Sequence, residues 1–401
     1  MNGSGHAVRI GRVFGIDIAF DYSWLFIVFL LTWSLASTFT HLHPDWTMVE
    51  SLGIALLAAL LFFLSVVLHE LAHSLVARSF GVPVRNITLF LFGGVSNIER
   101  EPPSPRAEFL TAIVGPLTSI AIGIILLVIA SAAVDVPFGA TTSGAVLSRL
   151  GPGETLLLWL GPINLIVGLF NLIPGFPLDG GRVLRSILWA ATHNLHDATR
   201  WASAVGQAIG WLFVFLGVAI AFGAYVPFFG RGLVSGLWLA FIGWFLSSAA
   251  AQTWRRQLVH EILEGVTVSR LMRPVHDVVP ETTDVATFVD RWLMKSEQPA
   301  FVVYDETGRV SGIVTLADVR AVRRDAWPDM RVSQIMTPRD RLVVASPSEG
   351  LMEALEKLMR ADVGQLPVLD GERLAGMLLR TDVARWIELH VQPPRARTYA
   401  H

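Results

Sequence analysis

The sequence contains no cysteine, which excludes disulfide bonds and thiolate ligands, so any metal site must use histidine and carboxylate side chains. Charge is also scarce: charged residues make up 16% of the 401 residues, whereas hydrophobic residues make up 53%. The formal net charge of −2 provides no basic field for nucleic acid, which we exclude as a partner. This composition is typical of a protein in a lipid bilayer, and the length is sufficient for two or three domains.

Long apolar segments fill the chain between Trp24 and Ala251, and charge concentrates after Arg255. A helix of about 20 residues spans the roughly 30 Å hydrocarbon core of a bilayer. The sequence therefore predicts a polytopic α-helical membrane protein with about six transmembrane helices. Before them, Phe14 to Phe20 alternates loosely, which predicts a short strand at the membrane edge. The predicted spans are 23–40, 52–80, 109–134, 155–172, 201–224 and 233–251.

Arginine residues mark one side of these predicted helices. The opposite loops carry only Arg149 and Arg231. By the positive-inside rule, both termini and the segment after the last span face the cytoplasm of a plasma membrane protein. The arginines of the cytoplasmic side are Arg9, Arg12, Arg78, Arg85, Arg100, Arg106, Arg182, Arg185, Arg200, Arg255 and Arg256.

The second span contains an H-E-x-x-H motif, His69-Glu70-Leu71-Ala72-His73. Residues four apart lie on one face of a helix, so the two histidines can present imidazole nitrogens to one metal ion. Neutral imidazoles suit zinc, and Glu70 lies close enough to take a proton from a metal-bound water. The alternative is a core helix with a chance motif. An ionisable residue at membrane depth costs roughly 2.5–3.5 kcal/mol on insertion scales, so three in one turn favour a functional site.

A second motif, residues 171–182, interrupts the apolar segments with prolines and glycines. Non-helical backbone at membrane depth persists only where it is buried in protein or lines a wet cavity. Asp179 lies in this break and is the best intramembrane carboxylate for the third ligand that a catalytic zinc site needs. The alternative for Asp179 is the N-cap of a helix that begins near Val183. His193 and His196 are expected at the cytoplasmic surface, without a role in metal binding.

Together, the H-E-x-x-H motif and Asn171-Leu-Ile-Pro-Gly-Phe-Pro-Leu-Asp179-Gly-Gly resemble the site-2 protease family of intramembrane zinc metalloproteases. The resemblance covers roughly Phe14 to Ala251. It implies that His69, His73 and Asp179 bind one zinc ion per chain. It also implies that Glu70 activates water and that Asn171 helps to stabilise the oxyanion.

The segment Phe90 to Ile98 has the composition of an ordinary loop, in which glycines permit tight turns. The family resemblance implies instead that Gly93, Gly94 and Val95 belong to a hairpin that pairs with an unwound substrate segment. It further implies that the substrate is a transmembrane segment of a membrane-bound regulator that another protease has already trimmed.

The chain after Arg255 contains an internal repeat of about 64 residues. Val268-Ser-Arg-Leu-Met-Arg-Pro274 returns as Val332-Ser-Gln-Ile-Met-Thr-Pro338, and each copy is predicted to fold as strand, helix, strand, strand, helix. The repeat resembles a tandem pair of CBS domains, which is an α+β module. Bacterial site-2 proteases with a C-terminal CBS pair form a known subgroup, so the resemblance implies CBS-pair regulation and a homodimer through this pair.

Gly312-x-x-Thr315-x-x-Asp318 resembles the nucleotide-binding pattern of CBS domains, in which the aspartate binds ribose hydroxyls and the hydroxyl residue contacts phosphate. The second copy keeps Asp382 but has Leu379 at the hydroxyl position, where an apolar side chain cannot donate. We therefore predict at most one adenine-nucleotide site in the module. The alternative is a structural CBS pair that only mediates dimerisation.

These observations divide the chain into a transmembrane zinc metalloprotease domain (1–255), a linker (256–264), two CBS domains (265–328 and 329–390) and a disordered tail (391–401). The predicted function is an intramembrane endopeptidase. A CBS-regulated channel or transporter is the alternative, because broken helices also suit ion sites, although such a protein does not need an H-E-x-x-H motif. A catalytically silent membrane scaffold is the third possibility.

Overall fold

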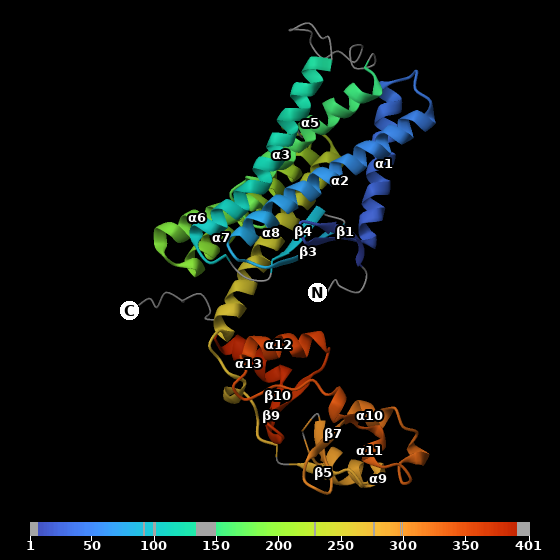
Figure 1. Ribbon diagram of the computed structural model, residues 1–401, viewed down its shortest axis with the longest axis vertical. Helices are drawn as coiled ribbons and strands as arrows, with labels where there is room; N and C mark the ends of the chain where they lie inside the picture. The colour runs from blue at the N-terminus through green and yellow to red at the C-terminus, as the bar shows by residue number, and fades with distance from the viewer. Residues whose placement is uncertain are drawn as a thin grey trace. The chain divides into compact units, whose positions relative to one another are not determined.

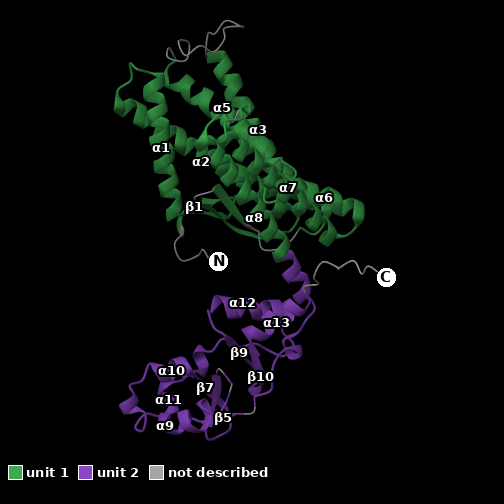
Figure 2. Cartoon of the chain, turned by 180° about the vertical axis from the view of Figure 1, so that it is seen from behind, with its two compact units in different colours: residues 1–255 green, residues 256–401 purple. Residues whose placement is uncertain are grey.

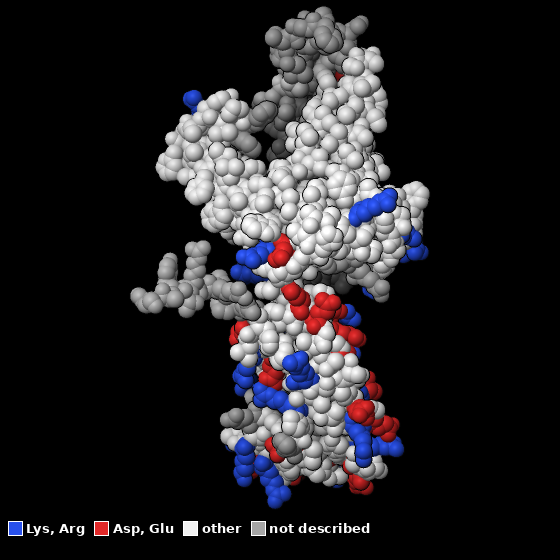
Figure 3. All heavy atoms as spheres, turned by 90° about the vertical axis from the view of Figure 1, so that its left-hand side faces the viewer, with Lys and Arg blue, Asp and Glu red and all other residues white. Residues whose placement is uncertain are grey.

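The computed structural model describes residues 7–90, 93–98, 102–133, 150–227, 230–275, 277–296, 298 and 300–390. The predicted disordered tail, 391–401, lies outside these residues. The structure forms two compact units, Met1–Arg255 and Arg256–His401, each described here by itself (Figure 2). On the face that Figure 3 shows, charged side chains are sparse over the first unit and frequent over the second, as the distribution of charge along the sequence predicts.

Among the described residues, six helices are long and apolar enough to cross a membrane, which confirms the predicted polytopic fold (Figure 1). They have 20 to 32 residues each, and many of their large hydrophobic side chains are exposed on the outside, where a bilayer would cover them. A capping box between Thr47 and Glu50 fixes the start of the longest one. The six are α1 (Tyr22–Leu42), α2 (Met48–Ser79), α3 (Pro105–Ala133), α5 (Pro152–Asn171), α7 (Leu195–Ala221) and α8 (Leu233–Leu263).

A four-stranded sheet packs against the C-terminal part of α2. The predicted strand at residues 14–20 is present from Ile16, but the chain turns at Phe14 and Gly15, both at positive φ, and a further strand precedes them. The strand order is β1-β2-β3-β4, so β4 forms one edge of the sheet in the described part of the chain. Strands β2 and β3 run parallel, and the other neighbours run antiparallel. The strands are β1 (Ala7–Val13), β2 (Ile16–Asp21), β3 (Val84–Phe90) and β4 (Gly93–Ile98).

Between α5 and α7, the chain leaves the helical conformation at residues 172–178 and then forms α6 (Asp179–Thr192). This break occurs where the prolines and glycines of the second motif predict it. Helix α6 packs against both α3 and α7. A buried ion pair between Glu108 of α3 and Arg185 of α6 joins the first two of these helices.

The second unit contains both copies of the repeat. The start of each copy pairs with the last strand of the other: β8 pairs with β7, and Arg273 exchanges two backbone hydrogen bonds with Met377. This exchange joins the copies into one module. The regular elements are β5 (Val278–Pro280), α9 (Val285–Phe288), β6 (Ala300–Tyr304), β7 (Val310–Thr315), α10 (Leu316–Arg320), α11 (Val332–Ile335), β8 (Thr337–Pro338), α12 (Leu351–Arg360), β9 (Gln365–Asp370), β10 (Arg373–Leu379) and α13 (Arg380–His390), with a π-helix at Val289–Leu293 and 3-10 turns at Val268–Arg270, Arg324–Ala326 and Arg339–Arg341.

Candidate metal centre

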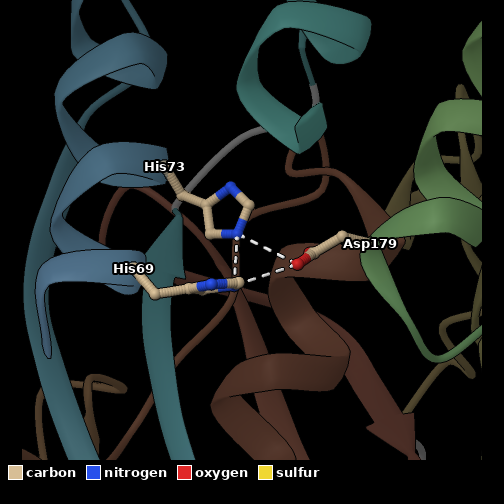
Figure 4. Close-up of side chains that lie close together, drawn as sticks. All are labelled: His69, His73 and Asp179. Atoms are coloured by element: carbon tan, nitrogen blue, oxygen red, sulfur yellow. Dashed lines mark hydrogen bonds and ion pairs between the residues drawn. The ribbon is translucent and has the colours of Figure 1, made fainter. Parts of the chain in front are cut away.

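Helix α2 places His69 and His73 on one face, as their spacing predicts. Both side chains are buried, and their Nε2 atoms lie 3.2 Å apart (Figure 4). Burial of two histidines in the middle of an apolar helix removes water from them, so each needs partners inside the protein. The two Nε2 atoms face the same point, and this convergence is the geometry of a pair of metal ligands.

Asp179 completes this group from the other side. Its Oδ2 atom lies 3.1 Å from Nε2 of His69 and 3.2 Å from Nε2 of His73. Leu178 occupies the N-cap position of α6 and Asp179 is the first helical residue, so the alternative role of Asp179 as a cap does not describe its place in the structure. The break before α6 thus delivers a carboxylate to two histidines that precede it by more than 100 residues.

Helix α3 orients the two imidazole rings. Nδ1 of His73 lies 2.5 Å from the backbone oxygen of Thr111, and Nδ1 of His69 lies 2.9 Å from Oγ of Ser119. A carbonyl oxygen only accepts, so Nδ1 of His73 donates to it, and Nε2 is the ring nitrogen that remains for a metal. Gly115 lies between these positions, and a Cβ atom there would come within 2.8 Å of Nε2 of His69. The motifs alone did not reveal this support, although residues 111, 115 and 119 are four apart and share one face of the helix.

The chemistry of this donor set fits zinc. Two imidazole nitrogens and one carboxylate oxygen lie within 4.8 Å of one another, and three protein ligands are the usual number in catalytic zinc sites. Each imidazole also has the hydrogen-bond partner on its other nitrogen that metal-binding histidines generally have.

Glu70 lies beside this group and interacts with strand β4. Its Oε2 accepts a hydrogen bond from Oγ of Ser96 at 2.6 Å. A Cβ atom on Gly94 would come 2.6 Å from Cγ of Glu70, so only a glycine lets the strand approach this closely. Val95 lies between these two residues and is 46% exposed. Gly93 begins the strand at positive φ. The segment is therefore a strand and not an ordinary loop.

Asn171 is the last residue of α5, and its Nδ2 donates to the backbone oxygen of Val167 at 3.1 Å. In the described part of the chain, no hydrogen bond joins it to the histidines or to Asp179. His193 is exposed at the end of α6, and His196 packs against Trp254. None of these three residues belongs to the converging group.

The two candidate nucleotide positions of the CBS pair differ in their partners. Asp318 accepts hydrogen bonds from the backbone and hydroxyl of Thr315, both at 2.7 Å, and so closes a capping box at the start of α10. Asp382 is bound by the guanidinium group of Arg273, which reaches both carboxylate oxygens. This ion pair raises the pKa of Arg273.

Comparison with known proteins also indicates a zinc metalloprotease with CBS domains. The family model of Peptidase family M50 matches residues 57–217. The model of the CBS domain matches twice, at residues 268–325 and 332–389. The "Putative zinc metalloprotease Rip3" of Mycobacterium tuberculosis is 33% identical over 391 residues, 96% of this chain and 93% of that protein. "Zinc metalloprotease MJ0392" of Methanocaldococcus jannaschii is 28% identical to this chain, and the alignment covers 95% of this chain and 96% of that protein.

Among solved structures, a "Site-2 Protease from Methanocaldococcus jannaschii" is 27% identical, with a TM-score of 0.39 over 62% of this chain and 96% of its own. The membrane helices and the converging His–His–Asp group are those of a membrane-embedded zinc metalloprotease. The chain belongs to peptidase family M50, the site-2 protease family, and carries a C-terminal pair of CBS domains. The alternative of a channel or transporter is thereby set aside.

Proposed function

We propose that the protein cleaves transmembrane segments of membrane-bound regulators inside the bilayer, with Glu70 as the general base at a zinc site formed by His69, His73 and Asp179. The observation that carries this proposal is the convergence of two Nε2 atoms and one Oδ2 atom at 3.1–3.2 Å beside a glutamate. When bound, zinc would act as a Lewis acid that polarises the substrate carbonyl and lowers the pKa of water.

The residues of the chain divide the remaining work. Glu70 takes a proton from the attacking water while the water oxygen bonds to the peptide carbonyl carbon. Glu70 then passes that proton to the leaving amine as the C–N bond breaks. Asn171 donates one amide hydrogen to Val167, which leaves its second amide hydrogen for the negative charge that develops on the carbonyl oxygen.

Substrate binding is assigned to Gly93, Gly94 and Val95. A helical peptide bond is shielded by its own hydrogen bonds, so the substrate segment must unwind before cleavage. Strand β4 lies at the edge of the sheet and next to Glu70, which supports addition of the unwound segment as a further strand. Backbone hydrogen bonds to β4 would hold the extended segment whatever its side chains, and the exposed Val95 would contact it.

Zinc content tests the ligand assignment. Purified wild-type protein is expected to carry about one zinc per chain, and His69→Ala, His73→Ala and Asp179→Ala are each expected to lose most of it, because two remaining ligands do not hold a catalytic zinc. His193→Asn is the control, since this exposed histidine is outside the group and asparagine tolerates its positive φ. Elemental analysis provides the measurement, and full zinc in Asp179→Ala would place the third ligand elsewhere.

The arginine distribution supports a plasma membrane protein with both termini and the CBS pair in the cytoplasm. The absence of native cysteine makes labelling with a membrane-impermeant maleimide specific. A cysteine at the exposed Ser269 is expected to react only after the cells are opened, and one at the exposed Asp45, between α1 and α2, is expected to react in intact cells. The reverse result for the two positions contradicts this orientation.

We also propose that the CBS pair regulates the protease through one adenine-nucleotide site around Thr315 and Asp318. Arg273 holds both oxygens of Asp382, and Leu379 offers no hydroxyl, so the second position is already engaged. A ligand at the first position must displace only the hydrogen bonds of the capping box. Regulation further requires that the ligand bind two states of the protein with different affinity.

Calorimetry on the full chain in detergent micelles tests this site. At least one of ATP, ADP and AMP is expected to bind wild type and Asp382→Ala alike, and to lose most of its heat with Asp318→Asn, which keeps an acceptor for the helix cap. Loss of binding with Asp382→Ala alone would move the site to the second copy. Absence of heat with all three nucleotides at millimolar concentration would leave the CBS pair as a dimerisation module.

A further inference from the structure

Strand β4 presents two of its residues to Glu70. Side chains alternate along a strand, so Gly94 and Ser96 face one side and Val95 faces the other. On the first side, the backbone at Gly94 lies directly against Cγ of Glu70, and the hydroxyl of Ser96 lies 2.6 Å from Oε2. The strand assigned to substrate binding therefore also determines where the carboxylate of Glu70 can lie.

A chain of hydroxyl groups supports this contact. Ser74 is fully buried on α2, one turn after Glu70, and its Oγ donates to Oγ of Ser96 at 3.2 Å. Ser96 in turn donates to Oε2 of Glu70. A hydrogen bond from a hydroxyl to a carboxylate is charge-assisted, and a donor that itself accepts a hydrogen bond is strengthened. In the described part of the chain, no hydrogen bond engages Oε1 of Glu70, so this oxygen stays available for a water proton.

We propose that Ser96 is a positioning residue for Glu70: its hydroxyl holds Oε2 so that Oε1 faces the reacting water. The proposal rests on the proposed role of Glu70 as the general base. A base must come within about 2.6–3.2 Å of the proton that it takes, and a half-buried glutamate side chain has several rotamers that miss this distance. Because Ser96 belongs to β4, the strand assigned to substrate binding also positions the base.

The test compares Ser96→Ala with Ser96→Thr in the full chain, using a transmembrane substrate. Ser96→Ala is expected to lower kcat roughly 10- to 100-fold, because misplacement of a reacting group by about 1 Å has an effect of this order. KM is expected to change less than about twofold and the zinc content not at all, since Ser96 touches neither the exposed side of β4 nor the histidines. Ser96→Thr keeps the hydroxyl and is expected to restore most of kcat.

Ser65→Ala is the matched control, because Ser65 is buried on the helix that carries Glu70, and among the described residues its hydroxyl donates only to the backbone oxygen of Phe62. Wild-type kcat in Ser96→Ala, or a loss that Ser96→Thr does not restore, overturns the inference. A rise in KM alone, or loss of zinc, also overturns it, because Ser96 would then support substrate or fold. Glu70→Gln separates the two levels: if it still cleaves, the proposed function is wrong, whereas an inactive Glu70→Gln beside an unchanged Ser96→Ala contradicts only the role of Ser96.

Discussion

Glu70→Gln is expected to abolish cleavage of a transmembrane substrate while the protein keeps its zinc. Glutamine has the same shape and can still accept the hydrogen bond from Ser96, but its amide cannot take a proton from water. Loss of a general base typically costs about 10²- to 10⁴-fold in rate, which brings cleavage close to background. The measurement is cleavage of a reconstituted substrate, with zinc analysis on the same preparation.

Glu50→Gln provides the control for this experiment. Glu50 lies on the same helix, and glutamine can replace glutamate in the capping box that Glu50 forms with Thr47. Its activity and zinc content are expected to match wild type. Cleavage by Glu70→Gln at the wild-type rate would require another base, and loss of zinc from Glu70→Gln would mean that Glu70 helps to bind the metal.

The parts of the fold that the sequence predicts are those with a local physical signal. Apolar runs of about 20 residues predict membrane helices, since no other uniformly apolar segment of that length is common in proteins. The spacing of His69 and His73 predicts a shared face because the helical repeat alone determines it. Asp179 is distant in sequence, yet it was predicted, because it is the carboxylate in a break that membrane depth does not tolerate without a reason.

Features that depend on pairing between distant segments were not predicted. Strand β2 pairs in parallel with β3, so that Asp17 lies opposite Asn86, and neither segment alone indicates this partner. The contact of Ser96 with Glu70 depends on that sheet, and so does β4 itself, which the family resemblance implies as part of a hairpin but which local composition does not indicate. Local composition favours a loop at Gly93 and Gly94, but the hydrogen bonds of β3 decide the conformation.

The ion pair between Glu108 and Arg185 was also missed, because 77 residues separate its members and each looks ordinary in sequence. Glu108 is fully buried and Arg185 is 7% exposed. The guanidinium group donates to Oε1 of Glu108 and lies over the ring of Phe176, 5.5 Å from its centre. One side chain thus connects α3, the break before α6 and α6 itself. Helix α3 orients the histidines and α6 begins with Asp179, so this pair fixes both sides of the metal centre.

Arg185→Met is therefore expected to destabilise the first unit by about 3–5 kcal/mol, because it removes the guanidinium group that pairs with the fully buried carboxylate of Glu108. The midpoint of thermal unfolding in detergent is expected to fall by roughly 10 °C. Zinc content is expected to fall as well, since the helix that begins with Asp179 loses its ion pair with α3. Tryptophan fluorescence during heating, together with elemental analysis, provides the measurement.

A double variant tests whether the stability lost in Arg185→Met comes from the buried charge of Glu108 or from the lost link between α3 and α6. Glu108→Met combined with Arg185→Met removes both charges of this pair, and replacement of a buried pair by apolar residues of similar volume is often close to neutral. The double variant is therefore expected to be more stable than either single variant. Arg182→Met, a half-buried arginine on the same helix, is the control and is expected to change stability by no more than about 0.5 kcal/mol. If Arg185→Met unfolds at the same temperature as this control, the ion pair does not hold α6 against α3, and the position of Asp179 depends on the break and on the remaining packing of α6 against α3 and α7.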